Sequence, residues 1–409
     1  MQSCDKSDVF GLEIHLKQPE CQVFPCGVIK SIPRCFIRPF EKPGLQPSNV
    51  LFIHFGVLLM KKSLIALAVL AASGASMAQS SVTLYGVADV WFGSVKSEVG
   101  PAKTDPATNF FDKSGLAGSS LRQTVLDSGG VNTSRWGLKG SEDLGGGLKA
   151  NFLLEQGFEV DTGKAKGENQ AFARQSYVGF SGGFGEVKLG KVWTAYDDVS
   201  GASNAVFDSA LSPMNHVFRS TDYKSNPGST IYYVTPTFSG FSGAISYSLG
   251  EDKTAATSAT STTSLNLSYG AGPVAVQLGY QVESNKTLGK ADQKFTRLGG
   301  SYDFGMAVAK LTYGHVSNVD NATGDDAKEY QVGVDFPVSA ALTVSASYAK
   351  SDDSNTGFEQ TRKGYGIGAS YALSKRTFVY GGYTANKANN ATVGDDKLNI
   401  LALGVNHKF

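Results

Sequence analysis

The sequence predicts an all-β fold, a closed antiparallel sheet of sixteen strands that spans a membrane, and three observations support this fold class. From Val82 onward, apolar and polar residues alternate with a period of two in segment after segment, which places them on opposite faces of β-strands. Most of these segments run nine to twelve residues, the length that a tilted strand needs to cross a bilayer and longer than a usual soluble strand. Their connections alternate between short turns and long polar loops, the plan of a transmembrane β-barrel.

Composition excludes several other classes of protein. The chain has 409 residues and a formal net charge of +1, with Lys+Arg 37 against Asp+Glu 36. A nucleic-acid binder would show a clear basic excess, and a disordered chain would contain far fewer aromatic residues than Phe 24 and Tyr 17. After position 80 no uninterrupted apolar run reaches about 20 residues, so the sequence does not predict a bundle of transmembrane helices.

The first part of the chain differs from the rest. Residues 1–59 contain all four cysteines and show no sustained alternation. Met60 opens a stretch with the parts of a secretory signal peptide: two lysines, an apolar run over 64–72, and small residues that end at Ala78.

We therefore interpret residues 60–78 as a signal peptide cleaved after Ala78, and residues 79–409 as the barrel. Residues 1–59 are interpreted as an upstream extension that is either disordered or not made. The alternatives are a genuine cysteine-bearing extension and a transmembrane anchor that begins near Val50. The predicted mature chain contains no cysteine, so redox chemistry is not expected in it.

Each expected strand is a stretch of alternation bounded by turn residues. In the first strand, Val82, Leu84 and Phe92 alternate with Thr83 and Asp89. The third expected strand, 146–157, and the last, 398–409, show the same period of two. In chain order the expected strands are 82–93, 132–141, 146–157, 171–182, 184–194, 228–237, 240–249, 263–271, 273–283, 293–304, 306–317, 328–337, 341–350, 362–373, 376–387 and 398–409.

The connections between these strands are of two kinds. Short turns are expected at 142–145, 182–183, 239, 272, 305, 339–340 and 374–375. Long polar loops lie between them, as at 251–262, 318–327, 351–361 and 388–397. Aromatic residues gather at segment ends, as in membrane-interface girdles, although strand propensity alone would also enrich them. Sixteen closed strands leave an aqueous bore rather than a core filled by side chains.

Several stretches of the mature chain carry a family resemblance. They are SSVTLYGVADVWFG near the predicted N-terminus, SRWGLKGSEDLGGGLKANFLLEQGFEVDTG (134–163), FARQSYVGFSGGFGEVKLGKVWTAYD (172–197) and the C-terminal GVNHKF. They resemble Gram-negative general diffusion porins of the β-proteobacterial and neisserial type, over the whole of residues 79–409. The resemblance implies a homotrimeric, water-filled channel in the bacterial outer membrane for passive diffusion of ions and small hydrophilic solutes. It also implies contact with outer-membrane lipid and lipopolysaccharide, and recognition of Phe409 by the barrel-assembly machinery.

The same resemblance implies which residues narrow the pore. The third long loop, 194–227, is expected to fold into the bore. The other connections are expected to be short turns on the periplasmic side and long loops on the extracellular side. The third long loop carries the expected constriction residues Asp197, Asp208 and Arg219.

On the opposite wall the resemblance places Arg135 of SRWG, Arg174 of FARQSYVGF and the acidic Glu155. A third basic position falls on Lys224, for which Arg219 is a possible substitute. Strand parity agrees independently, because Glu155 alternates with Leu154 and so faces the lumen. We expect a mild anion preference, because the basic groups outnumber Glu155 on this wall.

Three other functions stay open at this stage: a substrate-specific channel, a plugged barrel that acts as an adhesin or structural protein, and an enzyme built on a barrel. The sequence has no G-x-S-x-G element, and His216, His315 and His407 show no zinc spacing. The run Gly145–Gly147 lacks the following Lys-Ser/Thr of a phosphate-binding loop and is interpreted as a turn. We therefore predict no catalytic residue, no metal site and no cofactor.

Overall fold

The computed structural model describes residues 81–100, 118–167, 169–287, 289–354, 360–390 and 394–409. All of them belong to one compact unit, Leu67–Phe409. The second unit, Met1–Ala66, lies outside the described residues, and so do the predicted extension 1–59 and signal peptide 60–78. Among the described residues no helix is both long and apolar enough to cross a membrane.

The described strands form one antiparallel sheet. They are β1 (Ser81–Glu98), β2 (Ser120–Ser128), β3 (Arg135–Gly145), β4 (Leu148–Gly157), β5 (Gln175–Gly182), β6 (Gly185–Lys191), β7 (Thr230–Val234), β8 (Phe241–Leu249), β9 (Ser261–Ala271), β10 (Val274–Ser284), β11 (Gln293–Asp303), β12 (Val308–Ser317), β13 (Asp326–Pro337), β14 (Leu342–Ser354), β15 (Gln360–Ala372), β16 (Thr377–Asn390) and β17 (Asp396–Lys408).

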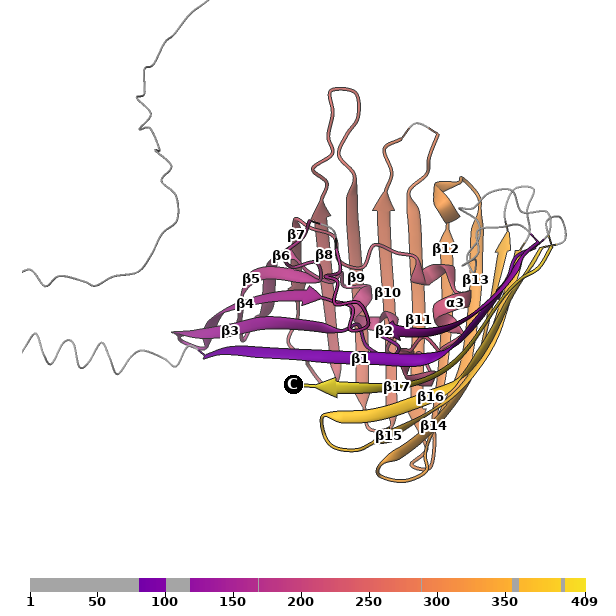
Figure 1. Ribbon diagram of the computed structural model, residues 1–409. Helices are drawn as coiled ribbons and strands as arrows, with labels where there is room; N and C mark the ends of the chain where they lie inside the picture. The colour runs from indigo at the N-terminus through magenta and orange to yellow at the C-terminus, as the bar shows by residue number, and fades with distance from the viewer. Residues whose placement is uncertain (1–80, 101–117, 168, 288, 355–359, 391–393) are drawn as a thin grey trace, which may run out of the picture. The chain divides into compact units, whose positions relative to one another are not determined.

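The sheet closes on itself, as predicted (Figure 1). From β3 onward each strand pairs with the next along the chain, and β17 returns to pair with β1 from Val87 to Glu98. On its other edge β1 pairs with β2 through Val90–Glu98 and with β3 through Ser81–Val87. Strands β2 and β3 therefore share one position in the barrel, and the closed sheet has sixteen strand positions.

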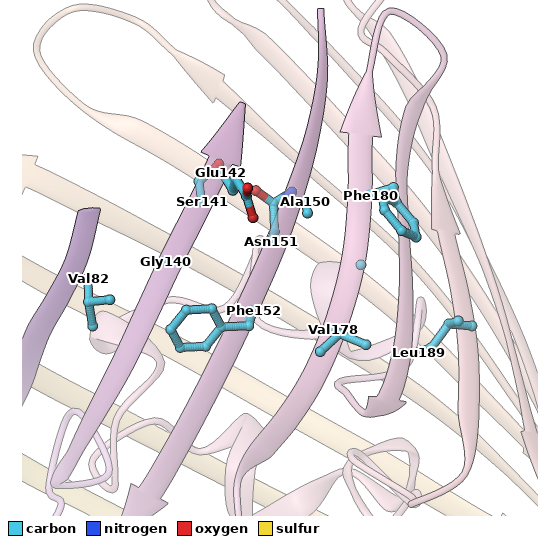
Figure 2. Close-up of a pocket in the computed structure, with 11 residues that line it drawn as sticks. Val82, Gly140, Ser141, Glu142, Ala150, Asn151, Phe152, Val178, Phe180 and Leu189 are labelled. Carbon is cyan, nitrogen blue, oxygen red and sulfur yellow. The ribbon is translucent and has the colours of Figure 1, made fainter. Parts of the chain in front are cut away.

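Large apolar side chains are exposed on the outer face of the barrel. In β1, Val82, Leu84 and Phe92 are more than half exposed, whereas the alternate residues Asp89 and Trp91 are buried. Figure 2 shows Val82, Phe152, Val178 and Leu189, from β1, β4, β5 and β6, around one outward hollow of about 290 Å³. In water such an apolar band would cost free energy, so its natural surrounding is lipid.

The alternation of short and long connections is also present. One rim has short links such as Gly146–Gly147 between β3 and β4. Gly145, Gly146 and Gly147 all have positive φ, a conformation that suits glycine, which confirms that this run is a turn. Longer segments join the strands at the opposite rim, where the helix η4 (Val319–Asn321) lies between β12 and β13.

One expected connection was wrong. The strands expected at 82–93 and 132–141 leave residues 94–131 between them as a loop, but β1 continues to Glu98 and β2 occupies Ser120–Ser128. The β2 sequence SLRQTVLDS mixes polar and apolar residues on both faces. Period-two reasoning therefore had no clear signal to detect, and only the pairing of β2 with β1 defines it as a strand.

The third long loop packs against inward-facing residues of the wall. Between β6 and β7 it forms α2 (Asp197–Ser200), η2 (Val206–Asp208), α3 (Met214–Val217) and η3 (Arg219–Thr221). Several of its apolar side chains are buried there. Val206 and Leu211 pack in one cluster with Trp91, Tyr380 and Ile400, and Met214 and Phe218 pack with Ala349. These contacts are the reason that the loop lies in the lumen.

Candidate functional site

Two arginines share one carboxylate on the inner wall. Arg135 begins β3, Glu155 lies near the end of β4, and Arg174 directly precedes β5. The Arg174 Nε atom donates to Glu155 Oε1 at 2.8 Å, and the Arg135 Nε atom lies 3.3 Å from Glu155 Oε2. Tyr85 donates its hydroxyl to the same Oε2 atom at 2.8 Å. Because Glu155 is nearly fully buried, the cluster is a fixed group of two positive charges and one negative charge.

Neighbouring groups hold both guanidinium groups in place. Arg174 lies over the Trp193 ring at 4.8 Å, a cation–π contact. Asn226 of the third loop donates its side-chain amide to the Arg174 carbonyl at 2.8 Å. The Arg135 Nη1 atom donates to the Thr133 carbonyl at 3.0 Å. The geometry of the wall therefore depends on the turn before β3 and on the end of the third loop.

A lysine that sequence reasoning missed extends the basic wall. Lys188 in β6 lies 4.8 Å from the centre of the Tyr232 ring and 5.4 Å from that of Tyr177. Its neighbour Leu189 is exposed on the outer face, so Lys188 has inward parity. Alternation in GEVKLGK would have found this residue, because Glu186 and Lys188 alternate with apolar side chains.

Carboxylates of the third loop line a cavity of about 470 Å³ inside the barrel. They are Asp197 and Asp198 in α2 and Asp208 in η2, and Tyr223 and Arg297 complete this part of the lining. Tyr223 donates to Asp197 Oδ1 at 2.6 Å, and Asn204 Nδ2 donates to Asp208 Oδ1 at 2.6 Å. The expected loop residues Asp197 and Asp208 thus lie at one site.

Burial weakens the acidity of this face. Burial raises the pKa of Asp197 to about 6, against the opposing effects of the Tyr223 hydrogen bond and the positive charge of Arg174. Burial also raises the pKa of Asp198, while the Tyr232 hydrogen bond and the charge of Lys188 oppose the rise. The wall cations Arg174 and Lys188 therefore act electrostatically on the carboxylates of the loop.

The loop backbone around η2 is strained. Val206, Phe207 and Asp208 all have φ between 49° and 65°, a conformation that costs a non-glycine residue about 1–3 kcal/mol. The Val206 N–H donates to Ser345 Oγ of β14 at 2.7 Å, and Ser209 Oγ donates to the Val206 carbonyl at 2.6 Å. These bonds keep Asp208 on the cavity.

A buried aspartate connects the wall to the loop. Asp89 in β1 accepts hydrogen bonds from the Gly130 N–H at 2.9 Å, the Asn132 N–H at 3.0 Å and the Tyr380 hydroxyl at 2.6 Å. The Gly130 carbonyl in turn accepts from the Ala210 N–H of the third loop at 2.7 Å. Sequence reasoning missed Asp89, because its donors come together only once the barrel has closed.

Two expected constriction residues lie apart from the arginine pair. Arg219 forms ion pairs with Asp353 at 3.0 Å and with Asp320 at 3.8 Å, so it belongs to a separate cluster against β14. The side chain of Lys224 is exposed and borders a different hollow, although its N–H donates to Glu283 at 2.5 Å. The structure therefore brings together Arg135, Arg174 and Glu155 and separates Arg219 and Lys224 from them.

The last residue lies at the seam of the barrel. The Phe409 N–H donates to the Gly86 carbonyl at 3.0 Å, and the Gly86 N–H donates to the Phe409 carbonyl at the same distance. The ring is about half exposed. Within the described part of the chain, no group of three or more His, Cys, Asp or Glu residues is arranged to hold a metal ion.

Comparisons with known proteins agree with this architecture. A family model described as Gram-negative porin matches residues 64–391. Outer membrane porin protein 32 of Delftia acidovorans is 35% identical over 365 residues, which cover 85% of this chain and 95% of that protein. An outer membrane porin protein of Bordetella pertussis is 30% identical over 402 residues, covering 86% of this chain and 100% of its own. An anion-selective porin from Comamonas acidovorans superposes with a TM-score of 0.66 at 28% identity, over 81% of this chain and 100% of that one.

Proposed function

The chain belongs to the Gram-negative porin family, and we propose that its lumen is a water-filled channel with a mild preference for anions. The observation that carries this proposal is the shared carboxylate on the wall: Arg135 and Arg174 both contact Glu155, so one positive charge is left over. The similar solved structure from Comamonas acidovorans is described as anion-selective, which supports the same sign for this chain.

The proposed mechanism is a transverse field across the constriction. Guanidinium groups stay protonated at all physiological pH values, whereas Asp197 on the loop has a pKa of about 6. Anions pass along the basic wall and cations along the acidic loop, and the field in the narrow, partly low-dielectric lumen separates them. Because the wall charge is permanent and the loop acids are weakened, we expect anions to be favoured.

The test is the reversal potential of the refolded chain, beginning at Gln79, in a planar bilayer with a salt gradient. The double variant Arg135→Ala/Arg174→Ala removes two positive charges and leaves Glu155 alone. We expect its anion-to-cation permeability ratio to fall about eightfold, from the screened Coulomb energy of about 0.3 kcal/mol per charge on each ion.

The matched control removes two positive charges from the outer face. Lys294 and Lys328 are exposed, with outward parity on β11 and β13, so Lys294→Ala/Lys328→Ala leaves the ratio unchanged if the lumen charges decide selectivity. A double arginine variant with an unaltered reversal potential would refute the proposal. Folded barrels without any conductance would instead favour a plugged barrel.

We further propose the features that the family resemblance implies for assembly. Three copies of the chain form the native unit, so single-channel recordings should show conductance changes in groups of three steps. The signal peptide is cleaved after Ala78, which intact-mass measurement of the exported chain checks. The barrel-assembly machinery recognises Phe409, so deletion of this residue should lower the yield of assembled barrel. The fold and the family are those of a channel, and we infer that the chain has no catalytic role.

A further inference from the structure

Glycine residues are concentrated on the inner face of the wall that the third loop covers. Their neighbours along the strands, such as Leu298, Val332 and Ile367, are exposed on the outer face, so the glycines have inward parity. They come from β10, β11, β12, β13 and β15, and we call them the glycine patch: Gly279, Gly299, Gly314, Gly333, Gly366 and Gly368.

The backbone of these strands does not itself require glycine. None of the six residues of the glycine patch has a positive φ. Glycine weakens the interior of a strand, because it has no side chain to pack and loses more conformational entropy than other residues. Elsewhere the wall carries large inward side chains, such as Arg135 and Lys188. The glycine patch therefore needs a reason other than backbone conformation.

Atoms of the third loop occupy the space that side chains would need. A Cβ on Gly366 would overlap the carbonyl oxygen of Leu211 and lie 2.9 Å from Pro213 Cδ, and one on Gly333 would overlap Ala205 Cβ. Carbon atoms pack best at about 3.5–4.0 Å. The Leu211 oxygen belongs to the backbone, so no side-chain rotation can relieve its overlap. The loop residues closest to the glycine patch are Tyr196, Ser203, Ala205, Val206, Leu211 and Ser220.

The same close approach is present at β10 and β11. A Cβ on Gly279 would lie 2.9 Å from Tyr196 Cδ2, and one on Gly299 would overlap Ser203 Oγ. Ser203 Oγ shares a hydrogen bond of 2.7 Å with Thr312 Oγ1, so the serine could turn away only by losing that bond. The loop thus contacts the backbone of the wall from β10 to β15.

The wall is held more firmly than the loop. Gly333 is in register with Lys310 on one side and Ser347 on the other, and Gly366 with Ser347 and Thr384, so ladder hydrogen bonds fix both strands at their two edges. The loop around η2 is held instead by single hydrogen bonds such as that from the Val206 N–H to Ser345 Oγ. A methyl group added between them would therefore displace the loop, and the only free direction is away from the wall.

We propose that the glycine patch sets the size limit of the channel. Its residues are positioning residues: they let the loop backbone lie directly against the wall, and each added Cβ moves the loop into the bore. The inference rests on the proposed function, in which the lumen is the conducting path. It concerns the passage of neutral solutes, to which the charges of the wall cluster make no difference.

The experiment compares neighbouring glycines on opposite faces of β11. Gly299→Ala adds a methyl group toward Ser203, whereas in the control Gly300→Ala the nearest atom, the Ala275 carbonyl oxygen, is 3.5 Å from the new Cβ. Refolded barrels are recorded in planar bilayers with neutral polyethylene glycols of graded size. Gly299→Ala and Gly366→Ala should have lower conductance and lose entry of the largest polymer that wild type admits, while Gly300→Ala should match wild type. None of these variants alters a charge.

A second substitution on the loop tests whether the contact is the cause. Gly299→Ala/Ser203→Gly removes both the hydroxyl and the Cβ that the new methyl group would meet, so wild-type conductance and size limit should return. The same double variant should restore the folded fraction if Gly299→Ala lowers it. A crystal structure of Gly366→Ala should show residues 205–213 displaced from β15, a readout that does not depend on conduction.

Three results would overturn the inference. The first is a folded Gly366→Ala barrel with the size limit of wild type. The second is a Gly299→Ala/Ser203→Gly chain that remains narrow or fails to fold, which would mean that the strand itself needs the glycine. The third is a Gly366→Ala structure in which β15 moves and the loop does not. A folded wild-type barrel without conductance would contradict the proposed function instead, and the crystal structure would still decide the role of the glycine patch.

Discussion

Replacing Glu155 with Gln should make the channel more selective for anions. Glu155 holds the only negative charge in the cluster with Arg135 and Arg174. The change to Gln keeps the size of the side chain and one acceptor oxygen, so the Tyr85 hydroxyl, now 2.8 Å from Oε2, can still donate to it. The wall charge then rises from one positive charge to two.

The magnitude follows from Coulomb's law. An ion that passes roughly 7 Å from the carboxylate interacts with it by about 0.6 kcal/mol in water. Screening over a Debye length of about 10 Å at 0.1 M salt halves this to about 0.3 kcal/mol. Removal of the charge lowers the energy of an anion and raises that of a cation by this amount. The anion-to-cation ratio should therefore rise about threefold.

The assay is the reversal potential in a tenfold gradient of KCl. Four proteins that differ in the net charge of this wall cluster are compared. Anion preference should fall in the order Glu155→Gln, wild type, Arg135→Ala and Arg135→Ala/Arg174→Ala. Glu142→Gln is the matched control, because Glu142 lines the outward hollow of Figure 2 rather than the lumen. A Glu155→Gln channel with unchanged or lower anion preference would refute the reasoning.

Three further predictions concern the loop and the barrel seam. Lowering the pH from 7.5 to 5 protonates Asp197, whose raised pKa is about 6, so the loop loses negative charge and anion preference increases; Asp197→Asn should show a smaller pH response. Asp89→Ala leaves the Gly130 N–H and the Tyr380 hydroxyl without their acceptor, so urea unfolding should show a loss of roughly 3 kcal/mol. Deletion of Phe409 removes the terminal hydrogen bonds to Gly86. The fraction of folded barrel, measured by the shift in gel mobility on heating, should therefore be lower than in wild type.

The sequence alone was sufficient for the fold because a transmembrane barrel repeats one simple rule. Each strand must place apolar side chains toward lipid at every second position, and residues such as Leu401 and Leu403 of β17 follow it. The same rule failed for β2, which pairs with the last part of β1, Val90–Glu98. This part of β1 runs to the rim of the barrel, where the outer face need not be apolar.

The candidate site was predicted only in part, for a different physical reason. Strand parity and the family resemblance were enough for Glu155, Arg135 and Arg174, because register brings β3, β4 and the start of β5 together. Loop residues have no such register. Arg219 pairs with Asp353, which is 134 positions later in the chain, and no local pattern could indicate that contact. All seven expected constriction roles stay predictions: those of Arg135, Arg174, Glu155, Asp197, Asp208, Arg219 and Lys224.

The ratio of charges in the wall cluster decides what it can do. One arginine with one glutamate would be neutral and would give almost no field in the lumen, while two arginines without Glu155 would repel each other at the wall. With Glu155 between them, both guanidinium groups are held within 3.3 Å of a carboxylate oxygen, and one positive charge remains. The Trp193 ring and the Thr133 carbonyl fix the directions of the guanidinium groups. A fixed charge orients water without reorganisation when each ion passes, so preference for anions follows from this arrangement even though the loop opposite is acidic.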